Sequence, residues 1–192
     1  AMKSLRLRTG DKLKIGDGHG TVHTAEAVDM KPARVQVRVL DTRSEPPALD
    51  RLTVAVAPPK NPTRFEWFLE KATELGVDAI IPMHTERSER PHVKMNRSKR
   101  VILAAAKQSQ RVHLPVLEEI DDFDSILERA HGRKFMAHCR ADMARIPVDE
   151  ARKESRGEAW VLIGPEGGLS EAEVGAAREA GLHAACLGPR VL

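Results

Sequence analysis

Aromatic residues are scarce in this chain of 192 residues, which has four phenylalanines, two tryptophans and no tyrosine. Together they make up 3% of the sequence. Protein modules that read single-stranded RNA commonly stack its bases on aromatic side chains. The composition therefore argues against a stacking platform, and any contact with nucleic acid is expected to depend mainly on charge and shape.

Cysteine is almost absent as well, since only Cys139 and Cys186 occur and they lie far apart in the sequence. Neither belongs to a Cys-x-x-Cys pair, so no disulfide framework or zinc site is indicated, and both are interpreted as small buried hydrophobes. No metal site is expected either from the spacing of His84, His92, His113 and His138. No apolar run reaches the length of a membrane span, and a reducing cytoplasmic location is expected.

Positive charge is concentrated in one part of the chain, although the formal net charge is only +3. Residues 84–113 contain eight lysines and arginines but only two acidic residues. A basic segment on an otherwise nearly neutral protein is typical of a surface that faces a polyanion. A solvated helix face is the commoner explanation of charge runs in general, and both interpretations stay open on charge alone.

The first 50 residues have the pattern of an all-β module. Residues 35–40 alternate apolar and polar side chains, as a half-buried strand does, and Asp17–Gly20 is a turn signal. Residues 44–48 form a proline-containing linker, which is the predicted domain boundary.

After this linker the pattern changes to strands that alternate with helices, which predicts an α/β domain with a mainly parallel sheet. Strands are expected at residues 52–57, 79–81, 135–137, 160–163 and 184–187. Helices are expected at residues 65–75, with Gly76 as the stop, at 96–110, at 123–130 and after Ser170.

A glycine-rich loop, Gly164–Ser170, lies between the strand at 160–163 and the last of these helices. Ser170 and Glu173 form a capping box at the start of that helix. A dinucleotide-binding Rossmann domain would place Gly-x-Gly-x-x-Gly after the first strand. The loop there, Pro58–Pro62, has no glycine, so the sequence argues against a Rossmann dinucleotide site. Alone, the Gly164 loop could also be a tight turn without a ligand.

Two late segments, Gly164–Ser170 and Leu187–Leu192, resemble the paired cofactor loops of SPOUT methyltransferases. Three others, Phe65–Val77, Thr85–Ser88 and Gln108–Arg111, narrow the resemblance. Together they are similar to the RsmE family, bacterial enzymes that methylate N3 of a uridine in 16S ribosomal RNA of the small subunit.

The resemblance implies two domains and an assembly. It implies a small PUA-like RNA-binding β domain at residues 1–48 and a SPOUT methyltransferase domain with a trefoil knot at residues 49–192, in a homodimer. Members of the family have more residues before and after the segments matched here. The first domain is therefore expected to be incomplete at its start, and the second to lack its closing C-terminal segment.

The resemblance also implies S-adenosyl-L-methionine as the cofactor, bound in three loops. Their glycines would let the cofactor approach the backbone. The cofactor-binding residues it implies are His138, Cys139, Gly164, Pro165, Glu166, Gly167, Gly168, Leu187, Gly188, Pro189, Arg190 and Leu192.

Methylation of uracil at N3 requires that the N3 proton leave, so a cation near the uracil anion or a carboxylate that accepts the proton would assist. Arg190 and Glu166 are the candidate catalytic residues, and Glu166 could equally accept hydrogen bonds that stabilise its own loop. Arg111 is expected as a helix-borne contact to RNA. The full set of candidate RNA-binding residues is Arg6, Arg8, Arg87, Arg90, Lys107 and Arg111.

Three alternative functions stay open at this point. One is a nucleotide- or phosphate-binding α/β protein that uses the Gly164 loop. A SPOUT methyltransferase with similar loops could act on another RNA site, a ribose 2′-hydroxyl or a guanine. A non-catalytic RNA-binding protein could keep the fold without the cofactor.

Overall fold

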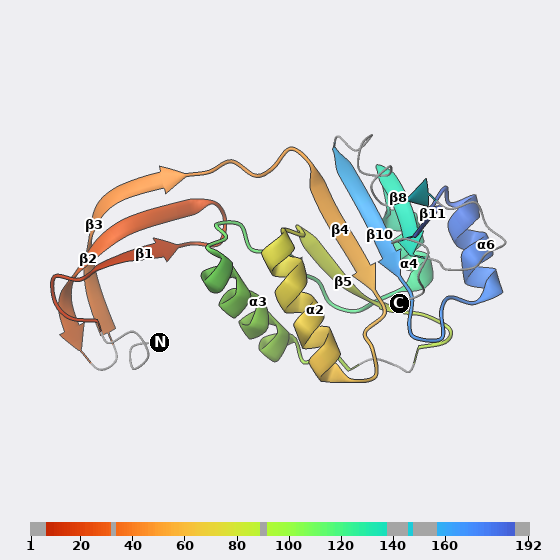
Figure 1. Cartoon of the computed structure of the whole chain (residues 1–192), viewed down its shortest axis with the longest axis horizontal. Helices are drawn as coiled ribbons and strands as arrows, with labels where there is room; N and C mark the ends of the chain where they lie inside the picture. The colour runs from red at the N-terminus through yellow and green to blue at the C-terminus, as the bar shows by residue number, and fades with distance from the viewer. Residues whose placement is uncertain (1–6, 32–33, 89–91, 138–145, 148–156, 187–192) are drawn as a thin grey trace. The chain divides into compact units, whose positions relative to one another are not determined.

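The structure is a computed structural model that describes residues 7–31, 34–88, 92–137, 146–147 and 157–186 (Figure 1). The chain divides into two compact units. The first comprises Ala1–Pro47 together with Gln110–Leu114, and the second comprises Ala48–Ser109 and Pro115–Leu192. The segment 110–114 is thus far in sequence from the rest of its unit.

The first unit contains an antiparallel sheet in the order β1-β2-β3. Its strands are β1 (Lys12–Gly16), β2 (Thr21–Lys31) and β3 (Arg34–Ser44), and β3 includes the strand predicted at residues 35–40. Segment 110–114 forms hydrogen bonds with the β1–β2 turn and, through His113, with the carbonyl of Glu45 just after β3. Gly20 N–H donates to the Val112 carbonyl at 3.0 Å, and Leu114 N–H donates to the Gly18 carbonyl at 2.9 Å.

The second unit is built on an eight-stranded sheet in the order β6-β5-β4-β10-β8-β11-β9, with β7 paired to β5. Every pairing in it is parallel. Its strands are β4 (Arg51–Val56), β5 (Ala79–His84), β6 (Val116–Leu117), β7 (Asp121–Asp122), β8 (Arg133–Ala137), β9 (Ile146–Pro147), β10 (Glu158–Ile163) and β11 (His183–Cys186).

Four helices connect these strands in the described part of the chain: α2 (Pro62–Leu75), α3 (Met95–Ser109), α4 (Phe123–Arg129) and α6 (Glu171–Glu179). Local sequence sets their ends. The side chain of Asn61 accepts a hydrogen bond from Thr63 N–H at the start of α2, and Gly76 caps its end. The capping box predicted from Ser170 and Glu173 is present in α6.

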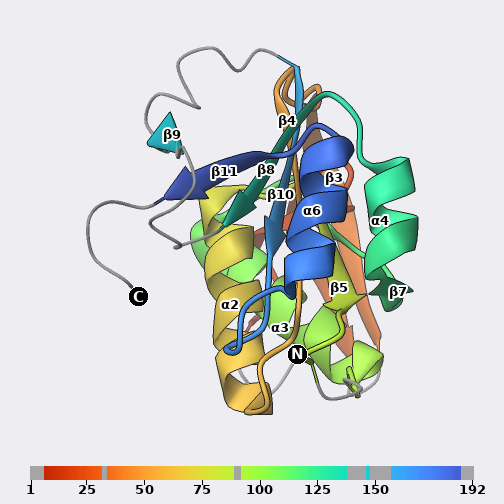
Figure 2. The ribbon, with the colours of Figure 1, turned by 90° about the vertical axis from the view of Figure 1, so that its right-hand side faces the viewer.

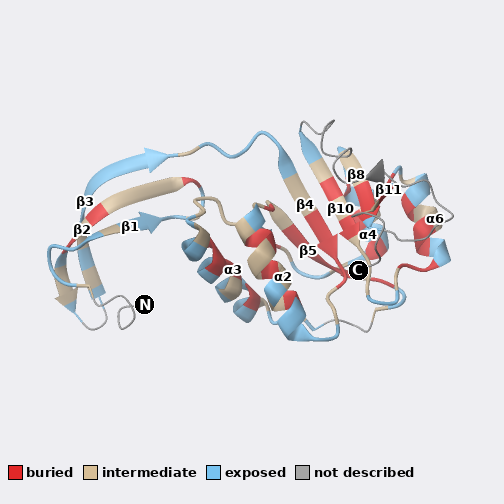
Figure 3. Ribbon diagram, in the orientation of Figure 1, coloured by how far each residue is buried: buried red, intermediate tan, exposed pale blue. Residues whose placement is uncertain are grey.

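The helices cover both faces of the parallel sheet. Figure 2 shows α2 and α3 on one side of it and α4 and α6 on the other. On the α4 and α6 side, Met83, Met136 and Leu162 of the strands pack with Phe123 and Val174 of the helices in one buried cluster. Figure 3 shows that buried positions gather along β4, β5 and β10, at the centre of the sheet.

The predicted α/β architecture with a mainly parallel sheet is confirmed. The short strands β6, β7 and β9 were not predicted, because two residues are too few to show a periodic pattern. Helix α3 ends at Ser109, and Gln110 follows with a φ of 57°. No helix in the described residues combines the length and the apolar character that crossing a membrane requires.

Candidate functional site

The carboxyl ends of the central strands lie side by side at one edge of the parallel sheet. Val56 of β4 pairs with Ile163 of β10, Ile163 pairs with Ala137 of β8, and Ala137 pairs with Ala185 of β11. After β4 the strand order runs in one direction, through β5 to β6. The other neighbour of β4 is β10, which belongs to the half of the sheet that also contains β8 and β11. Parallel α/β sheets bind ligands outside the carboxyl ends at such a reversal of strand order.

Three loops implied as the cofactor site leave this edge, from the adjacent strands β8, β10 and β11. Only the loop after β10, Gly164–Gly168, is described. The other candidate residues, His138, Cys139, Leu187, Gly188, Pro189, Arg190 and Leu192, lie outside the described residues. Cys186, the last residue of β11, is half-buried.

The glycines of the β10 loop have conformational reasons of their own. Gly168 has a φ of 71°, a left-handed conformation that favours glycine, and its N–H donates to the Pro165 carbonyl at 2.8 Å. A Cβ on Gly164 would lie 3.1 Å from Cγ of Leu169. A Cβ on Gly168 would meet nothing within 4 Å. The loop is therefore a tight turn whose backbone is open around Gly168.

Glu173 joins this loop to the loop that follows β5. Its side chain is 9% exposed and accepts hydrogen bonds from the N–H groups of Ser170, at 2.7 Å, and of Glu86, at 2.8 Å. The bond to Ser170 belongs to the predicted capping box, whereas the bond to Glu86 spans 87 residues of sequence. No local sequence pattern contains the second contact.

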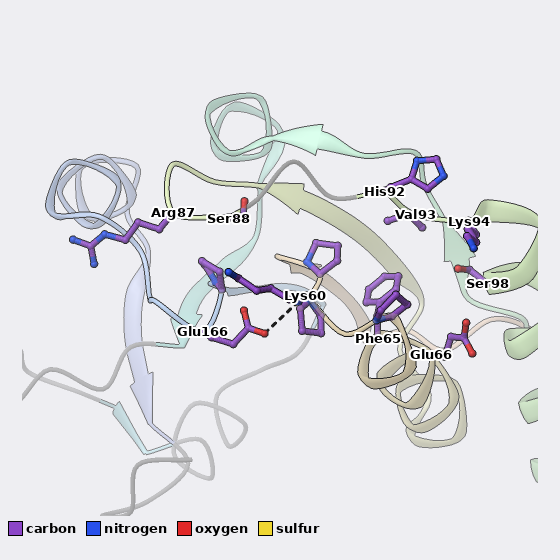
Figure 4. A pocket seen from close by; sticks show the side chains of 14 residues that line it. Lys60, Phe65, Glu66, Arg87, Ser88, His92, Val93, Lys94, Ser98 and Glu166 are labelled. Atoms are coloured by element: carbon purple, nitrogen blue, oxygen red, sulfur yellow. Dashed lines mark hydrogen bonds between the residues drawn. The ribbon is translucent and has the colours of Figure 1, made fainter.

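Arg87 and Glu166, two predicted site residues, lie at this junction. Arg87 donates a hydrogen bond from Nη1 to the Gly167 carbonyl at 3.1 Å. Glu166 is exposed, and its Oε1 accepts a hydrogen bond from the backbone N–H of Lys60 at 3.3 Å (dashed in Figure 4). The loops after β4, β5 and β10 are thus held together by side chains that bond to the backbone.

A cavity of about 200 Å³ opens among these three loops and the first turns of α2 and α3 (Figure 4). Arg87 and Glu166 line it, as do polar residues that were not predicted as site residues, among them Lys60, Glu66, His92, Lys94 and Ser98. These residues could be predicted only from the strand order, because loops that follow neighbouring parallel strands meet at one edge of the sheet.

The acidic residue on the α2 side of the cavity, Glu66, is engaged by a neighbouring arginine. Arg97 of α3 donates to Glu66 Oε2 from Nη2 at 2.8 Å, and its Nε also forms an ion pair with Glu66. Hydrogen bonding to Glu66 raises the pKa of Arg97. The negative charge of this wall is therefore balanced by Arg97.

Three other predicted RNA-binding residues, Arg8, Lys107 and Arg111, are described and do not line the cavity. Arg8 lies before β1 and Lys107 is exposed in the last turn of α3. Arg111 follows the end of α3, so the prediction that it is borne on a helix is wrong. It belongs to the segment 110–114 that bonds to the first unit. Arg6 and Arg90 lie outside the described residues.

Within the ranges that the structure describes, no group of three or more His, Cys, Asp or Glu side chains is arranged to hold a metal ion.

Comparison with known proteins places the chain among RNA-modifying enzymes. A family model described as RNA methyltransferase domain matches residues 45–192. Ribosomal RNA small subunit methyltransferase E of Mycobacterium bovis is 31% identical over 97% of this chain and 74% of its own length.

Two crystal structures are similar over the whole chain. A probable rRNA-methyltransferase from Porphyromonas gingivalis superposes with a TM-score of 0.89 at 30% identity, and the superposed region is 82% of that protein. A ribosomal RNA small subunit methyltransferase E from Neisseria gonorrhoeae, bound to S-adenosyl methionine, superposes with a TM-score of 0.86 at 27% identity. The superposed region is 80% of that protein.

Proposed function

We propose a function from the family of this chain, which belongs to the RNA methyltransferase domain family and within it to the ribosomal RNA small subunit methyltransferase E proteins. The proposed reaction is methylation of N3 of a uridine in 16S ribosomal RNA. The chain is an S-adenosylmethionine-dependent rRNA methyltransferase. The observation that carries the proposal is the likeness, over the full chain, to a solved relative bound to S-adenosyl methionine.

The described part of the site fits this cofactor. The strand ends before all three cofactor loops are neighbours in the sheet, and a Cβ placed on Gly168 would meet nothing within 4 Å. We assign cofactor binding to residues 164–168 together with His138, Cys139, Leu187, Gly188, Pro189, Arg190 and Leu192. When bound, S-adenosylmethionine supplies an electrophilic methyl group, and the protein contributes alignment of that group with the attacking nitrogen.

Glu166 is proposed as the acceptor of the uracil N3 proton, and Arg190 as the cation that stabilises the uracil anion. Glu166 suits this role because it is exposed on the cavity wall, and the hydrogen bond that it accepts from the backbone N–H of Lys60 is long, at 3.3 Å. One carboxylate oxygen can keep that bond while the other accepts a proton. Glu166 therefore combines a loop contact with a place on the substrate side of the loop.

RNA contact is proposed for basic residues of both units: Arg6, Arg8, Arg87, Arg90, Lys107 and Arg111. Phosphate neutralisation by such residues predicts strong salt dependence of RNA binding. The antiparallel β-sheet in the first unit supports a PUA-like RNA-binding domain. We further propose the trefoil knot of SPOUT proteins, a homodimer, domains divided near residue 48 and a cytoplasmic location, all from the family resemblance.

Nucleoside analysis of ribosomal RNA tests the function directly. Small-subunit RNA from cells with and without the gene would be digested and analysed by mass spectrometry. The expected result is loss of 3-methyluridine without the gene, and its return when purified protein and S-adenosylmethionine are added to the unmethylated subunits. Unchanged 3-methyluridine, or loss of a 2′-O-methyl nucleoside or a methylguanosine instead, would contradict the proposal.

A further inference from the structure

The cavity among the loops after β4, β5 and β10 is too small for a whole cofactor. Its volume is about 200 Å³, below the roughly 300–1,000 Å³ of pockets that enclose drug-sized ligands. It suits one chemical group of a larger molecule. Pro165 and Glu166 border it on one side, and the first turns of α2 and α3 border it on the other (Figure 4).

Ser98, in the first turn of α3, directs its hydroxyl into this cavity. The residue is 3% exposed, and its side chain points to the cavity interior in Figure 4. Within the described part of the chain this hydroxyl makes no hydrogen bond. Ser109 of the same helix bonds to the Ala105 carbonyl at 2.8 Å, and Thr73 of α2 bonds to the Leu69 carbonyl at 2.7 Å.

A buried hydroxyl normally finds such a partner within its own helix. Because the Ser98 hydroxyl faces the cavity, a ligand there can accept a hydrogen bond from it. The Ser98 hydroxyl is therefore a specific place for an acceptor atom rather than part of the helix packing.

The charges around Ser98 favour an acceptor that is an anion. The first turns of α2 and α3 contain no acidic residue, and the start of a helix carries a partial positive charge. Lys60, Arg87 and Lys94 also line the cavity. Glu66 is balanced by Arg97, and among the described lining residues the other carboxylate is that of Glu166, at the opposite side.

We propose that this cavity binds a backbone phosphate of the RNA strand that carries the methylated nucleotide. The Ser98 hydroxyl donates a hydrogen bond to a phosphate oxygen, and Lys94 supplies positive charge. The inference rests on the proposed function for the identity of the polyanion. The shared wall at Pro165 and Glu166 supports RNA over a free anion, because a strand that brings its uridine to the Gly164–Gly168 loop passes the mouth of the cavity.

RNA affinity of the cofactor-free protein tests this proposal. Fluorescence anisotropy with a labelled single-stranded RNA spanning the methylated uridine would be recorded over a series of salt concentrations. Loss of the hydroxyl in Ser98→Ala is expected to weaken binding about three- to tenfold. Ser98→Asp, which places a carboxylate against the phosphate, should weaken it more than about tenfold. Lys94→Gln should reduce the slope of log K against log salt by about 0.7, the value for one contact to a single strand.

Lys99→Gln is the matched control, because Lys99 is an exposed lysine of the same helix that does not line the cavity. It should change binding less than Lys94→Gln does. Thermal melting establishes that each variant is folded, and Ser98→Ala should melt like the wild type since no hydrogen bond is lost. Folded Ser98 variants with wild-type affinity, or equal effects of Lys94→Gln and Lys99→Gln, would overturn the phosphate site. Absence of methyl transfer with this binding pattern intact would instead reject only the proposed function.

Discussion

The amino ends and the carboxyl ends of the parallel strands, here called the amino edge and the carboxyl edge of the sheet, differ in how many of their polar groups have hydrogen-bond partners. At the amino ends of the strands, Asp50 accepts a hydrogen bond from Gly157 N–H at 2.7 Å, and Asp78 accepts one from Leu52 N–H at 2.8 Å. Glu158, at the start of β10, pairs with the side chain of His131. These acidic groups are occupied by partners within the fold.

The carboxyl ends are only partly satisfied. Glu173 holds two backbone N–H groups, but Thr85 Oγ1 is buried without a hydrogen-bond partner in the described chain. Ser98 and Lys94 line the open cavity at these ends. Buried polar groups in proteins are nearly always paired, so an unpaired hydroxyl at the same ends of the strands as a polar cavity indicates a place for a ligand. The amino edge should therefore control stability and the carboxyl edge should control binding.

A side chain at Gly132 should break the amino edge and produce the largest loss of stability. Gly132 has a φ of 67°, and a Cβ there would lie 2.3 Å from the Glu158 carbonyl oxygen. Backbone strain and this clash are expected to lower the free energy of unfolding of Gly132→Ala by at least about 2 kcal/mol. Urea denaturation measures the change.

Gly168→Ala is the matched control at the carboxyl edge. Its φ of 71° is similar, but an added Cβ would meet nothing within 4 Å. The expected loss is only about 1 kcal/mol, from strain alone. Equal losses in the two variants would mean that close packing does not distinguish the edges.

Glu173→Ala should affect both stability and binding, which sharpens the comparison. The change leaves two N–H groups, of Ser170 and Glu86, without their acceptor, and a loss of about 2 kcal/mol in unfolding free energy is expected. Because Glu173 ties the β5 loop to the β10 loop, the affinity for S-adenosylmethionine, measured by calorimetry, should fall as well. Glu173→Gln keeps one acceptor oxygen and should lie between the variant and the wild type.

Asp78→Ala provides the comparison at the amino edge, since it leaves one N–H group, of Leu52, without its acceptor. It should also lower stability, by about 1 kcal/mol, with cofactor affinity unchanged at temperatures where the protein is folded. Loss of cofactor affinity in Asp78→Ala would show that the carboxyl edge is not a separate binding region.

Local patterns in the sequence predicted much of the fold. The spacing of Phe65, Leu69 and Ala72, followed by Gly76, predicted α2. The three apolar residues lie on its buried face, and the glycine ends the helix. The Ser170 and Glu173 pair predicted the start of α6 for a similar reason. Such features depend on residues a few positions apart.

The cavity could not be predicted in this way. Ser98 is distinguished by an absent hydrogen bond, and Lys60 by its approach to Glu166, 106 residues away. Arg111 was assigned to a helix because α3 has a continuous helical pattern, but contacts with the first unit continue the chain differently after Ser109. These features depend on strand order and on long-range contacts, which a single sequence does not record.

Arg87→Gln should reduce methyl transfer with little change in stability. Arg87 is exposed on the cavity wall and bonds to the Gly167 carbonyl. Removing it is expected to lower kcat/KM on small ribosomal subunits about tenfold, which corresponds to about 1.4 kcal/mol. Unfolding free energy should stay within about 0.5 kcal/mol of the wild type.

Arg129→Gln is the control for this charge, because Arg129 pairs with Glu118 and Asp121 at the end of α4, away from the cavity. It should change stability by at most about 1 kcal/mol and leave kcat/KM unaltered. A similar loss of activity in both variants would indicate a general effect of positive charge on RNA binding.

The smallest expected effect is a pH dependence of stability at the amino edge. A hydrogen bond to the Arg129 carbonyl, and then one to Glu158, raise the pKa of His131. The protonated side chain is therefore favoured in the folded state, and its contribution to stability is complete below the unfolded pKa of about 6.5. It disappears as the pH rises through the higher folded value. His131→Gln should thus melt below the wild type near pH 5.5 and together with it near pH 9. Glu158→Gln should reduce the same difference, and neither variant should alter RNA affinity, because this charge pair lies at the edge that the cavity does not use. A melting difference that grows with pH would contradict the assignment.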